Sequence, residues 1–144
     1  AENWPAVRVA RRLFRLPYMD ARMSLRWKDG RVEYESVRTH RGEPPAEFRG
    51  SYRPTGPAAN ASPGTLAYFL AERYCLYACG WRGDTRLFRC DIHHRLWPLR
   101  EAEAEVPVNS MATAAGVTVP ARSPHLMFAE RLDVAAWWPE RVRD

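Results

Sequence analysis

Two adjacent histidines, His93 and His94, are the side chains of this sequence best suited to acid–base chemistry near neutral pH. They stand near the end of an expected strand, where successive side chains point to opposite faces, so only one of them can face an interior cavity. That one is a candidate general base or anion-binding imidazole. The alternative is a pair of strand-end histidines with ordinary structural hydrogen bonds, and we prefer it because histidine is so often structural.

Three cysteines, Cys75, Cys79 and Cys90, raise the possibility of a zinc site. Cys75 and Cys79 are four residues apart on one expected strand, or about 13 Å, and zinc ligands at ~2.3 Å from the metal cannot span that distance. A two-residue turn at Arg82 and Gly83 would place Cys75 opposite Cys90, whereas other turn registers separate them. We interpret all three as small buried apolar residues and expect no metal. Their odd number argues against a secreted disulfide framework and predicts a cytoplasmic protein with reduced thiols.

Three glutamates, Glu101, Glu103 and Glu105, alternate with alanines. On a strand, neighbours on the same face are about 6.6 Å apart, which is compatible with a pair of catalytic carboxylates. The same alternation is required by any half-buried strand with alanines packed inward. We prefer this second interpretation, an exposed strand face.

A stripe of four arginines follows helical spacing near the start of the chain: Arg8, Arg11, Arg12 and Arg15. The stripe could contact phosphates, and the net charge is +5. No aromatic residues are interleaved with it and no nucleic-acid-binding motif accompanies it. We therefore expect a solvated helix face and no nucleic-acid partner.

Lys28 is the chain's only lysine. It lies in the turn Lys28-Asp29-Gly30 between two alternating runs, and an Asp-Gly pair in that setting is a strong hairpin signal. The turn places Lys28 at the surface. The sequence therefore does not support chemistry in which a buried lysine forms a Schiff base.

Strands joined by short turns dominate the expected fold, which is mainly β (α+β), an antiparallel sheet or barrel in one domain of 144 residues. A turn around Arg82, Gly83 and Asp84 joins two of the strands. No apolar run reaches the ~20 residues needed to cross a bilayer, so we expect no membrane partner. The strands are predicted at residues 20–27, 31–39, 46–53, 74–79, 86–93, 99–106 and 125–138.

Two or three short helices accompany these strands. Asn3 can cap a first helix over residues 4–15, and Asn109 can cap a short helical turn. A second helix is expected to open at Ser62 and Pro63 and to end near Glu72. Its apolar spacing predicts a buried stripe made of Leu66, Phe69 and Leu70.

Several spaced motifs over nearly the whole chain resemble the YqjF-like family of uncharacterised proteins, which is grouped with acetoacetate decarboxylase. The resemblance implies a cone-shaped, largely antiparallel barrel with an internal ligand cavity and a tendency to form homo-oligomers. Family members usually carry an additional N-terminal portion, so the chain resembles the later part of such a protein. The motifs are Tyr52-Arg53-Pro54, Pro63-Gly64-Thr65-Leu66, Glu72-Arg73-Tyr74-Cys75-Leu76-Tyr77, Ile92-His93-His94 and Trp97-Pro98-Leu99.

In the decarboxylase, a lysine follows a Gly-Tyr-Pro-like turn just before a strand. The matching stretch here is Arg15-Leu16-Pro17-Tyr18, with a tyrosine in the place of the lysine. A tyrosine cannot form a Schiff base, so the resemblance does not extend to decarboxylase activity. No cofactor is implied.

Two functional hypotheses follow from the resemblance and the residues. The first is a barrel that binds a small, possibly anionic molecule through arginine and tyrosine hydrogen bonds. The second is an enzyme that acts on a small carbonyl or carboxylate substrate with His93 or His94 paired to Glu72 or Glu103. For the binding hypothesis, we expect one of the two histidines, and we choose His94, to line the cavity. The other expected lining residues are Tyr18, Arg73, Tyr74 and Tyr77.

Overall fold

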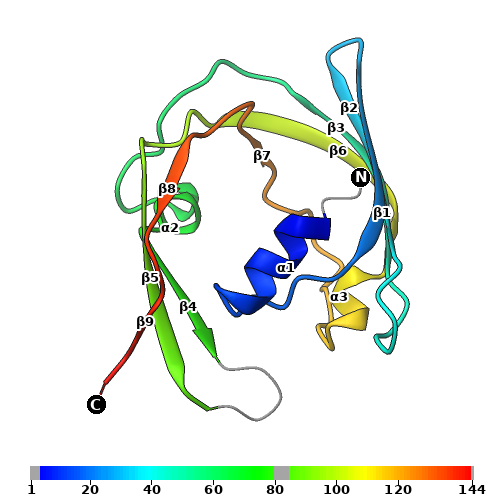
Figure 1. Cartoon of the computed structure of the whole chain (residues 1–144). Helices are drawn as coiled ribbons and strands as arrows, with labels where there is room; N and C mark the ends of the chain where they lie inside the picture. The colour runs from blue at the N-terminus through cyan, green and yellow to red at the C-terminus, as the bar shows by residue number, and fades with distance from the viewer. Residues whose placement is uncertain (1–3, 80–84, 144) are drawn as a thin grey trace. The chain divides into compact units, whose positions relative to one another are not determined.

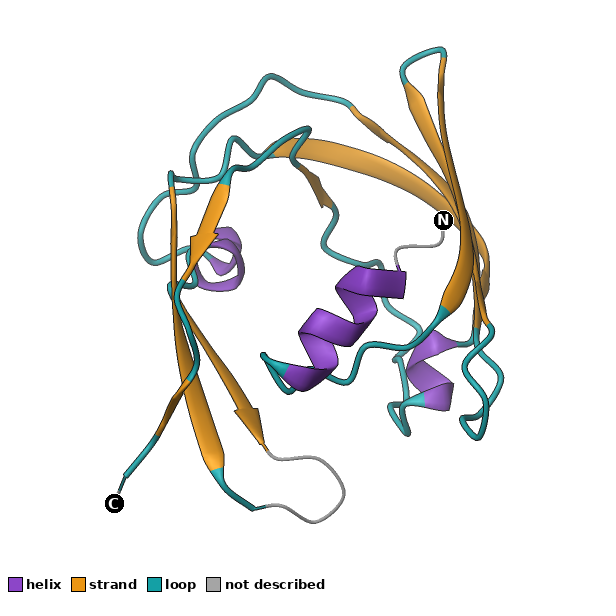
Figure 2. Ribbon diagram, viewed as in Figure 1, coloured by secondary structure: helices purple, strands orange, loops and turns teal. Residues whose placement is uncertain are grey.

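The computed structural model describes residues 4–79 and 85–143, which form two compact units, each built on one antiparallel sheet (Figures 1 and 2). Unit 1 comprises Met19–Pro57 and Arg100–Phe128. Unit 2 comprises the described residues of Trp4–Tyr18, Ala58–Leu99 and Ala129–Asp144. The mainly β class with short helices is confirmed. Across the described ranges the paired strands form two open sheets, and neither sheet closes into the expected barrel.

Unit 1 holds a five-stranded sheet in the order β1-β2-β3-β6-β7. Each neighbouring pair is antiparallel. The predicted strands near residues 20–27, 31–39, 46–53 and 99–106 are confirmed, although the last of them is longer than expected. The strands are β1 (Ala21–Lys28), β2 (Arg31–Arg38), β3 (Glu47–Pro54), β6 (Arg100–Asn109) and β7 (Met127–Phe128).

The turn between β1 and β2 has the chemistry that the sequence predicts. Asp29 (φ 52°) and Gly30 (φ 71°) both have positive φ, as a two-residue type I′ turn requires. Lys28 pairs with Arg31 as the last residue of β1, so it borders the turn instead of lying within it. Its side chain is exposed, as expected.

The apolar face of the unit 1 sheet carries the core of that unit. Trp27, Val32 and Tyr52 stand opposite one another across β1, β2 and β3 and therefore share a face. The ring of Phe128, on β7, lies 6.0 Å from both the Trp27 ring and the Tyr52 ring. Phe128 and Val32 are 8% and 3% exposed and form the buried part of this layer, whereas Trp27, on the edge strand β1, is 53% exposed.

The opposite face of this sheet is charged and exposed. Glu101, Glu103 and Glu105 face solvent on β6 while the intervening alanines are half-buried. Glu103 accepts hydrogen bonds from Nε and Nη2 of Arg53 at 3.0 and 2.8 Å. The exposed-face interpretation of the alternating glutamates is confirmed.

A single helical turn, α3 (Met111–Ala114), follows β6. The Asn109 side chain accepts a hydrogen bond from the backbone N–H of Met111 at 3.2 Å, as expected of a capping residue. The formal cap position is Ser110, whose hydroxyl accepts from the backbone N–H of Glu47 at 2.8 Å and so ties the turn to β3.

Unit 2 is organised around β5 (Leu87–His94), which pairs with β4 (Cys75–Cys79) on one side and with β8 (Val134–Ala136) and β9 (Glu140–Arg141) on the other. The hairpin predicted at residues 74–79 and 86–93 is confirmed, but its turn at Arg82, Gly83 and Asp84 lies outside the described residues. Two helices also belong to this unit: α1 (Trp4–Arg12) and α2 (Leu66–Ala71).

The prediction of a single long strand at residues 125–138 is wrong. This stretch contains β7 of unit 1 and β8 of unit 2, and β9 follows it. Along β5, the register shifts by one residue between the Ile92–Ala136 pair and the Arg89–Glu140 pair. One extra residue is thus accommodated within 137–139, which is the signature of a β-bulge.

Both longer helices differ from the sequence expectation. The first helix ends at Arg12, three residues earlier than expected. Arg15 has a positive φ of 53°, which is incompatible with a continuing helix. The expected cap, Asn3, lies outside the described residues. The second begins at Leu66, because Thr65 is the N-cap and its hydroxyl accepts from the backbone N–H of Tyr68 at 3.2 Å. The predicted buried stripe is wrong, since all three of its side chains are more than half exposed: Leu66, Phe69 and Leu70.

The arginine stripe is not simply a solvated face. Nη1 of Arg11 donates to the carbonyl oxygen of Tyr18 at 2.7 Å. The guanidinium of Arg15 lies 4.1 Å from the centroid of the Phe88 ring, a cation–π geometry. Arg11 therefore ties α1 to the segment that follows it, and Arg15 helps to hold this region onto β5. Throughout the two described stretches, no helix is long and apolar enough to cross a membrane.

The cysteines are not uniformly buried. In the observed register Cys75 stands opposite Asp91, and Cys90 stands opposite Leu76, so the facing Cys75–Cys90 arrangement does not occur. Cys90 is 3% exposed, Cys75 is half-buried and Cys79 is exposed. The prediction of three buried apolar thiols is correct only for Cys90.

Candidate functional site

Side chains of the central strand β5 alternate between the two faces of its sheet. Arg89, Asp91 and His93 are exposed on one face, while Cys90 and His94 are buried on the other. The two histidines therefore occupy different environments, as the strand alternation predicts.

His94 ties two backbone segments together. Its Nδ1 lies 2.8 Å from the carbonyl oxygen of Arg95, and its Nε2 lies 3.0 Å from the carbonyl oxygen of Arg73. Because a carbonyl oxygen only accepts, a protonated ring satisfies both contacts, whereas a neutral ring donates to one of them. The ring also stacks on Tyr74, with centroids 4.6 Å apart. These are the contacts of a structural histidine.

Glu72 joins the same cluster through its two carboxylate oxygens. Oε2 accepts a hydrogen bond from the Tyr74 hydroxyl at 2.6 Å, and Oε1 accepts from the backbone N–H of Trp97 at 3.1 Å. Trp97 meets the His94 ring edge-on at 5.9 Å. Tyr74 and Trp97 thus lie between the carboxylate and the imidazole, and among the described residues neither histidine hydrogen-bonds to Glu72. Glu103, the other proposed acid, belongs to unit 1 and is held by Arg53.

The Tyr74 phenol gives this cluster a measurable signature. Its hydrogen bond to the Glu72 carboxylate raises its pKa from 10.0 to about 12. The folded protein therefore holds this proton more tightly than the unfolded chain, so the contact stabilises the fold below about pH 10 and loses that effect as the pH rises towards 12. We expect one tyrosine to titrate late in an ultraviolet absorbance titration at high pH.

Two variants test this assignment. Tyr74→Phe should remove the late-titrating tyrosine, and Glu72→Gln should move its titration back towards that of an ordinary tyrosine. Tyr77→Phe is the matched control, because Tyr77 is a tyrosine of the adjacent strand and is 57% exposed. A late phase that persists in Tyr74→Phe would contradict the assignment.

The remaining residues of the predicted ligand-binding set do not gather with this cluster. Tyr18 and Tyr77 are 52% and 57% exposed. Arg73 places its guanidinium 3.9 Å from the centroid of the Phe69 ring. None of these three side chains lines either of the two clefts of unit 2 described next.

The first cleft, here called the tryptophan cleft, has a volume of about 510 Å³. It runs along the exposed face of β5 and the bulged edge between β8 and β9. Of the residues named as ligand-binding, only Tyr74 lines it, whereas His94 does not and the neighbouring His93 does. The complete lining is Tyr74, Arg89, Asp91, Ile92, His93, Trp137, Trp138 and Glu140.

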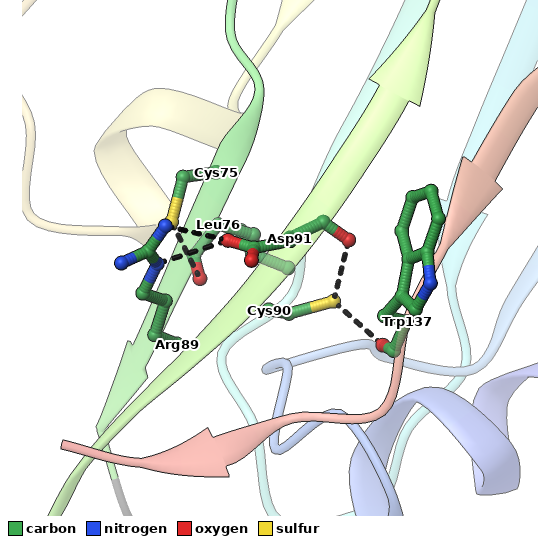
Figure 3. A network of polar contacts seen from close by, with 6 residues as sticks. All are labelled: Cys75, Leu76, Arg89, Cys90, Asp91 and Trp137. Carbon is green, nitrogen blue, oxygen red and sulfur yellow. Dashed lines mark hydrogen bonds and ion pairs between the residues drawn. The ribbon is translucent and has the colours of Figure 1, made fainter.

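Two of the residues that line the tryptophan cleft form an ion pair. Nε and Nη2 of Arg89 each lie 2.9 Å from Oδ1 of Asp91, as Figure 3 shows. Hydrogen bonding to Asp91 is the main cause that raises the pKa of the Arg89 guanidinium above its ordinary value. Both side chains are more than half exposed, so this contact organises the cleft and contributes little to stability.

The bulged edge is attached to β5 by a buried thiol. Sγ of Cys90 donates to the carbonyl oxygen of Trp137 at 3.0 Å (Figure 3). The backbone N–H of Trp137 donates in turn to the carbonyl oxygen of Asp91 at 3.0 Å. Burial raises the pKa of the Cys90 thiol, which favours the protonated, donating form. Cys90 therefore fixes the backbone from which the two tryptophans project.

The second cleft, here called the leucine cleft, has a volume of about 780 Å³ and also lies within unit 2. Arg131 is held by Asp133 through Nε and Nη2 at 3.1 and 2.9 Å. His93 borders both clefts. The complete lining is His93, His94, Arg95, Leu96, Pro98, Arg131, Leu132, Asp133, Val134 and Ala135.

Sequence reasoning missed most of the lining of both clefts. One usable signal was present, the spacing of Arg89, Asp91 and His93 at every second residue, which places three polar side chains on one face of a strand. The contributions of Trp137 and Glu140 depend on the bulge, which no sequence pattern indicated. As for metal ligands, no group of three His, Cys, Asp or Glu side chains converges within residues 4–79 and 85–143.

Comparison with known proteins supports the resemblance seen in the motifs. The model of the DUF2071 family, described as uncharacterized conserved protein, matches residues 1–133. The chain belongs to this family. Uncharacterized protein YqjF of Bacillus subtilis (strain 168) is 39% identical over 137 residues, which cover 95% of the chain and 54% of that protein.

The chain thus spans about half the length of this relative. No solved structure matches the chain. The predicted YqjF-like membership is confirmed, whereas the grouping with acetoacetate decarboxylase and the place in the later part of a longer protein stay predictions. The description of the DUF2071 family names no activity.

Proposed function

We propose that this DUF2071 chain binds a small carboxylate with an apolar body in the leucine cleft, without Schiff-base chemistry. The observation that carries the proposal is the charge balance of that cleft. Its one acidic side chain, Asp133, is engaged by Arg131. Arg95 and His93 have no side-chain hydrogen bond or ion pair to the rest of the described chain, so a guanidinium and an imidazole N–H are available to a ligand there.

The walls of the cleft fit the apolar part of such a ligand. Leu96, Pro98, Leu132 and Val134 supply aliphatic surface beside Arg95. A mainly apolar lining with a few polar groups is the usual composition of a small-molecule site, and a guanidinium is well suited to a carboxylate.

Acid–base catalysis by the predicted histidine–glutamate pair has less support. Both ring nitrogens of His94 face backbone carbonyl oxygens, and Glu72 is engaged by Tyr74 and Trp97. Lys28 lies on β1 of unit 1 and lines neither cleft, so covalent amine catalysis has no candidate residue there. A cytoplasmic location, the absence of nucleic-acid partners and homo-oligomer formation stay predictions.

The proposal predicts that hexanoate binds the protein more tightly than hexanamide, its uncharged analogue, by about fivefold in isothermal titration calorimetry. Arg95→Gln should reduce hexanoate affinity by about fivefold, because it removes one charge-assisted hydrogen bond at an open site, and should leave hexanamide affinity unchanged.

Arg141→Gln is the matched control. Arg141 is an exposed arginine that pairs with Phe88, six residues along β5 from His94, or about 20 Å away. This variant should bind both compounds like the wild type. Equal affinities for hexanoate and hexanamide, or an Arg95→Gln variant with unchanged hexanoate affinity, would contradict the proposal.

A further inference from the structure

The tryptophan cleft differs in chemistry from the leucine cleft, and its aromatic walls are held in place. Trp138, 71% exposed, stacks on Phe14 with ring centroids 6.4 Å apart and planes 13° from parallel. Tyr74 is fixed between the Glu72 carboxylate and the His94 ring. Trp137 is anchored through its backbone to β5. Three aromatic side chains with exposed surface therefore border one cleft.

The charges of this cleft do not favour an anion. Arg89 is neutralised by Asp91, and Glu140 stands directly opposite Arg89 in the strand register. Glu140 nevertheless makes no side-chain hydrogen bond or ion pair with any described residue. Of the arginine, aspartate and glutamate side chains that line the cleft, the one without a charge partner among the described residues is therefore a carboxylate. An anionic ligand would have to displace Asp91 from Arg89 and to tolerate Glu140 nearby.

We propose that the tryptophan cleft is a second binding site, which takes an organic cation of the alkylated ammonium class. The faces of Trp137, Trp138 and Tyr74 would attract the cation through their π-electrons, because tryptophan and tyrosine rings carry a negative potential on their faces. Glu140 supplies the countercharge. The β-bulge at residues 137–139 explains how two consecutive tryptophans and Glu140 reach one cleft, since a bulge re-aims the side chains of a strand edge.

This inference does not rest on the carboxylate site. The two clefts share only His93, and the residues that carry the two proposals differ: Arg95 for the carboxylate, and the tryptophans with Glu140 for the cation.

The test compares choline with 3,3-dimethyl-1-butanol, which has nearly the same shape and no charge. Binding is followed by the NMR signals of the tryptophan indole N–H groups, assigned through Trp137→Phe and Trp138→Phe. We expect choline to shift the Trp137 and Trp138 signals saturably and to bind about fivefold more tightly than the neutral analogue.

Two variants locate the site. Glu140→Gln and Trp138→Leu should each weaken choline binding by about threefold to fivefold, while binding of the neutral alcohol should not change in Glu140→Gln. Both positions are exposed, so the variants should fold normally. Glu101→Gln, which alters an exposed glutamate of unit 1, is the control and should match the wild type.

Three results would overturn the inference. One is equal affinity for choline and the neutral alcohol. Another is choline binding that shifts other indole signals but not those of Trp137 and Trp138. The third is choline affinity that is the same in Glu140→Gln and Trp138→Leu as in the wild type.

Discussion

Replacing Phe128 with alanine is expected to lower the free energy of unfolding by about 3–5 kcal/mol, the usual cost of removing a buried phenylalanine. Its ring is 8% exposed and contacts Trp27 and Tyr52, each at 6.0 Å between centroids. The strand β7 has only two residues, so its ladder contributes few hydrogen bonds. The side chain of Phe128, more than its backbone, holds this segment on the sheet.

Chemical denaturation followed by circular dichroism measures this loss. Met127→Ala is the control, because Met127 is the other residue of β7 and is 37% exposed. We expect it to cost less than about 1 kcal/mol. A Phe128→Ala variant as stable as Met127→Ala would show that the aromatic layer is not the core of unit 1.

Local chemistry was sufficient to predict much of unit 1 from the sequence. The Asp29-Gly30 pair specifies a type I′ turn because both residues adopt positive φ, and that turn fixes the register of β1 against β2. The alternation of glutamate with alanine on β6 likewise specifies which face is exposed. Both signals lie within a few residues of the structure that they determine.

Features that depend on distant partners could not be predicted in this way. The bulge at residues 137–139 arises because one chain segment follows β5 in two registers, and β5 is more than forty residues earlier in the chain. The periodicity of the segment shows only that it is extended. For the same reason the sequence did not show that residues 127–128 and 134–136 belong to different sheets.

The helix α2 shows the limit of hydrophobic periodicity. Leu66, Phe69 and Leu70 have the spacing of a buried helical stripe, yet all three are more than half exposed. Periodicity establishes that apolar side chains share one side of a helix. Whether another element covers that side is a tertiary fact, and the spacing contains no information about it.

The candidate site shows the same division between local and distant determinants. Strand alternation correctly separated His93 from His94, because that rule needs only two adjacent residues. The neighbours that decide their roles come from other segments: Arg73 and Trp97 around His94, and the residues 131–135 beside His93. Residue type allowed a catalytic role for one of the two histidines, although structural roles were preferred for both, whereas the contacts distinguish a buried structural ring from an exposed ring between two clefts.

The structural role of His94 leads to a second large expected effect. His94→Ala should lower the free energy of unfolding by about 2–3 kcal/mol, since it removes the ring nitrogens that face the carbonyl oxygens of Arg73 and Arg95 and deletes a ring that is 6% exposed. Thermal and chemical denaturation measure the change. His93→Ala is the matched control, because it alters the next residue of the same strand on the exposed face, and we expect a change within about 0.5 kcal/mol.

A third variant separates hydrogen bonding from packing at this position. His94→Phe keeps an aromatic ring against Tyr74 and Trp97 but has no donor for either carbonyl oxygen. If hydrogen bonding by the imidazole holds the segments on either side of the hairpin, this variant should be destabilised by about 1–3 kcal/mol. Wild-type stability in His94→Phe would mean that the ring acts only by packing, and the tie between Arg73 and Arg95 would then have no energetic role. A loss in His94→Phe with none in His93→Ala would show that, of the two adjacent histidines, only the buried one contributes to the stability of the fold.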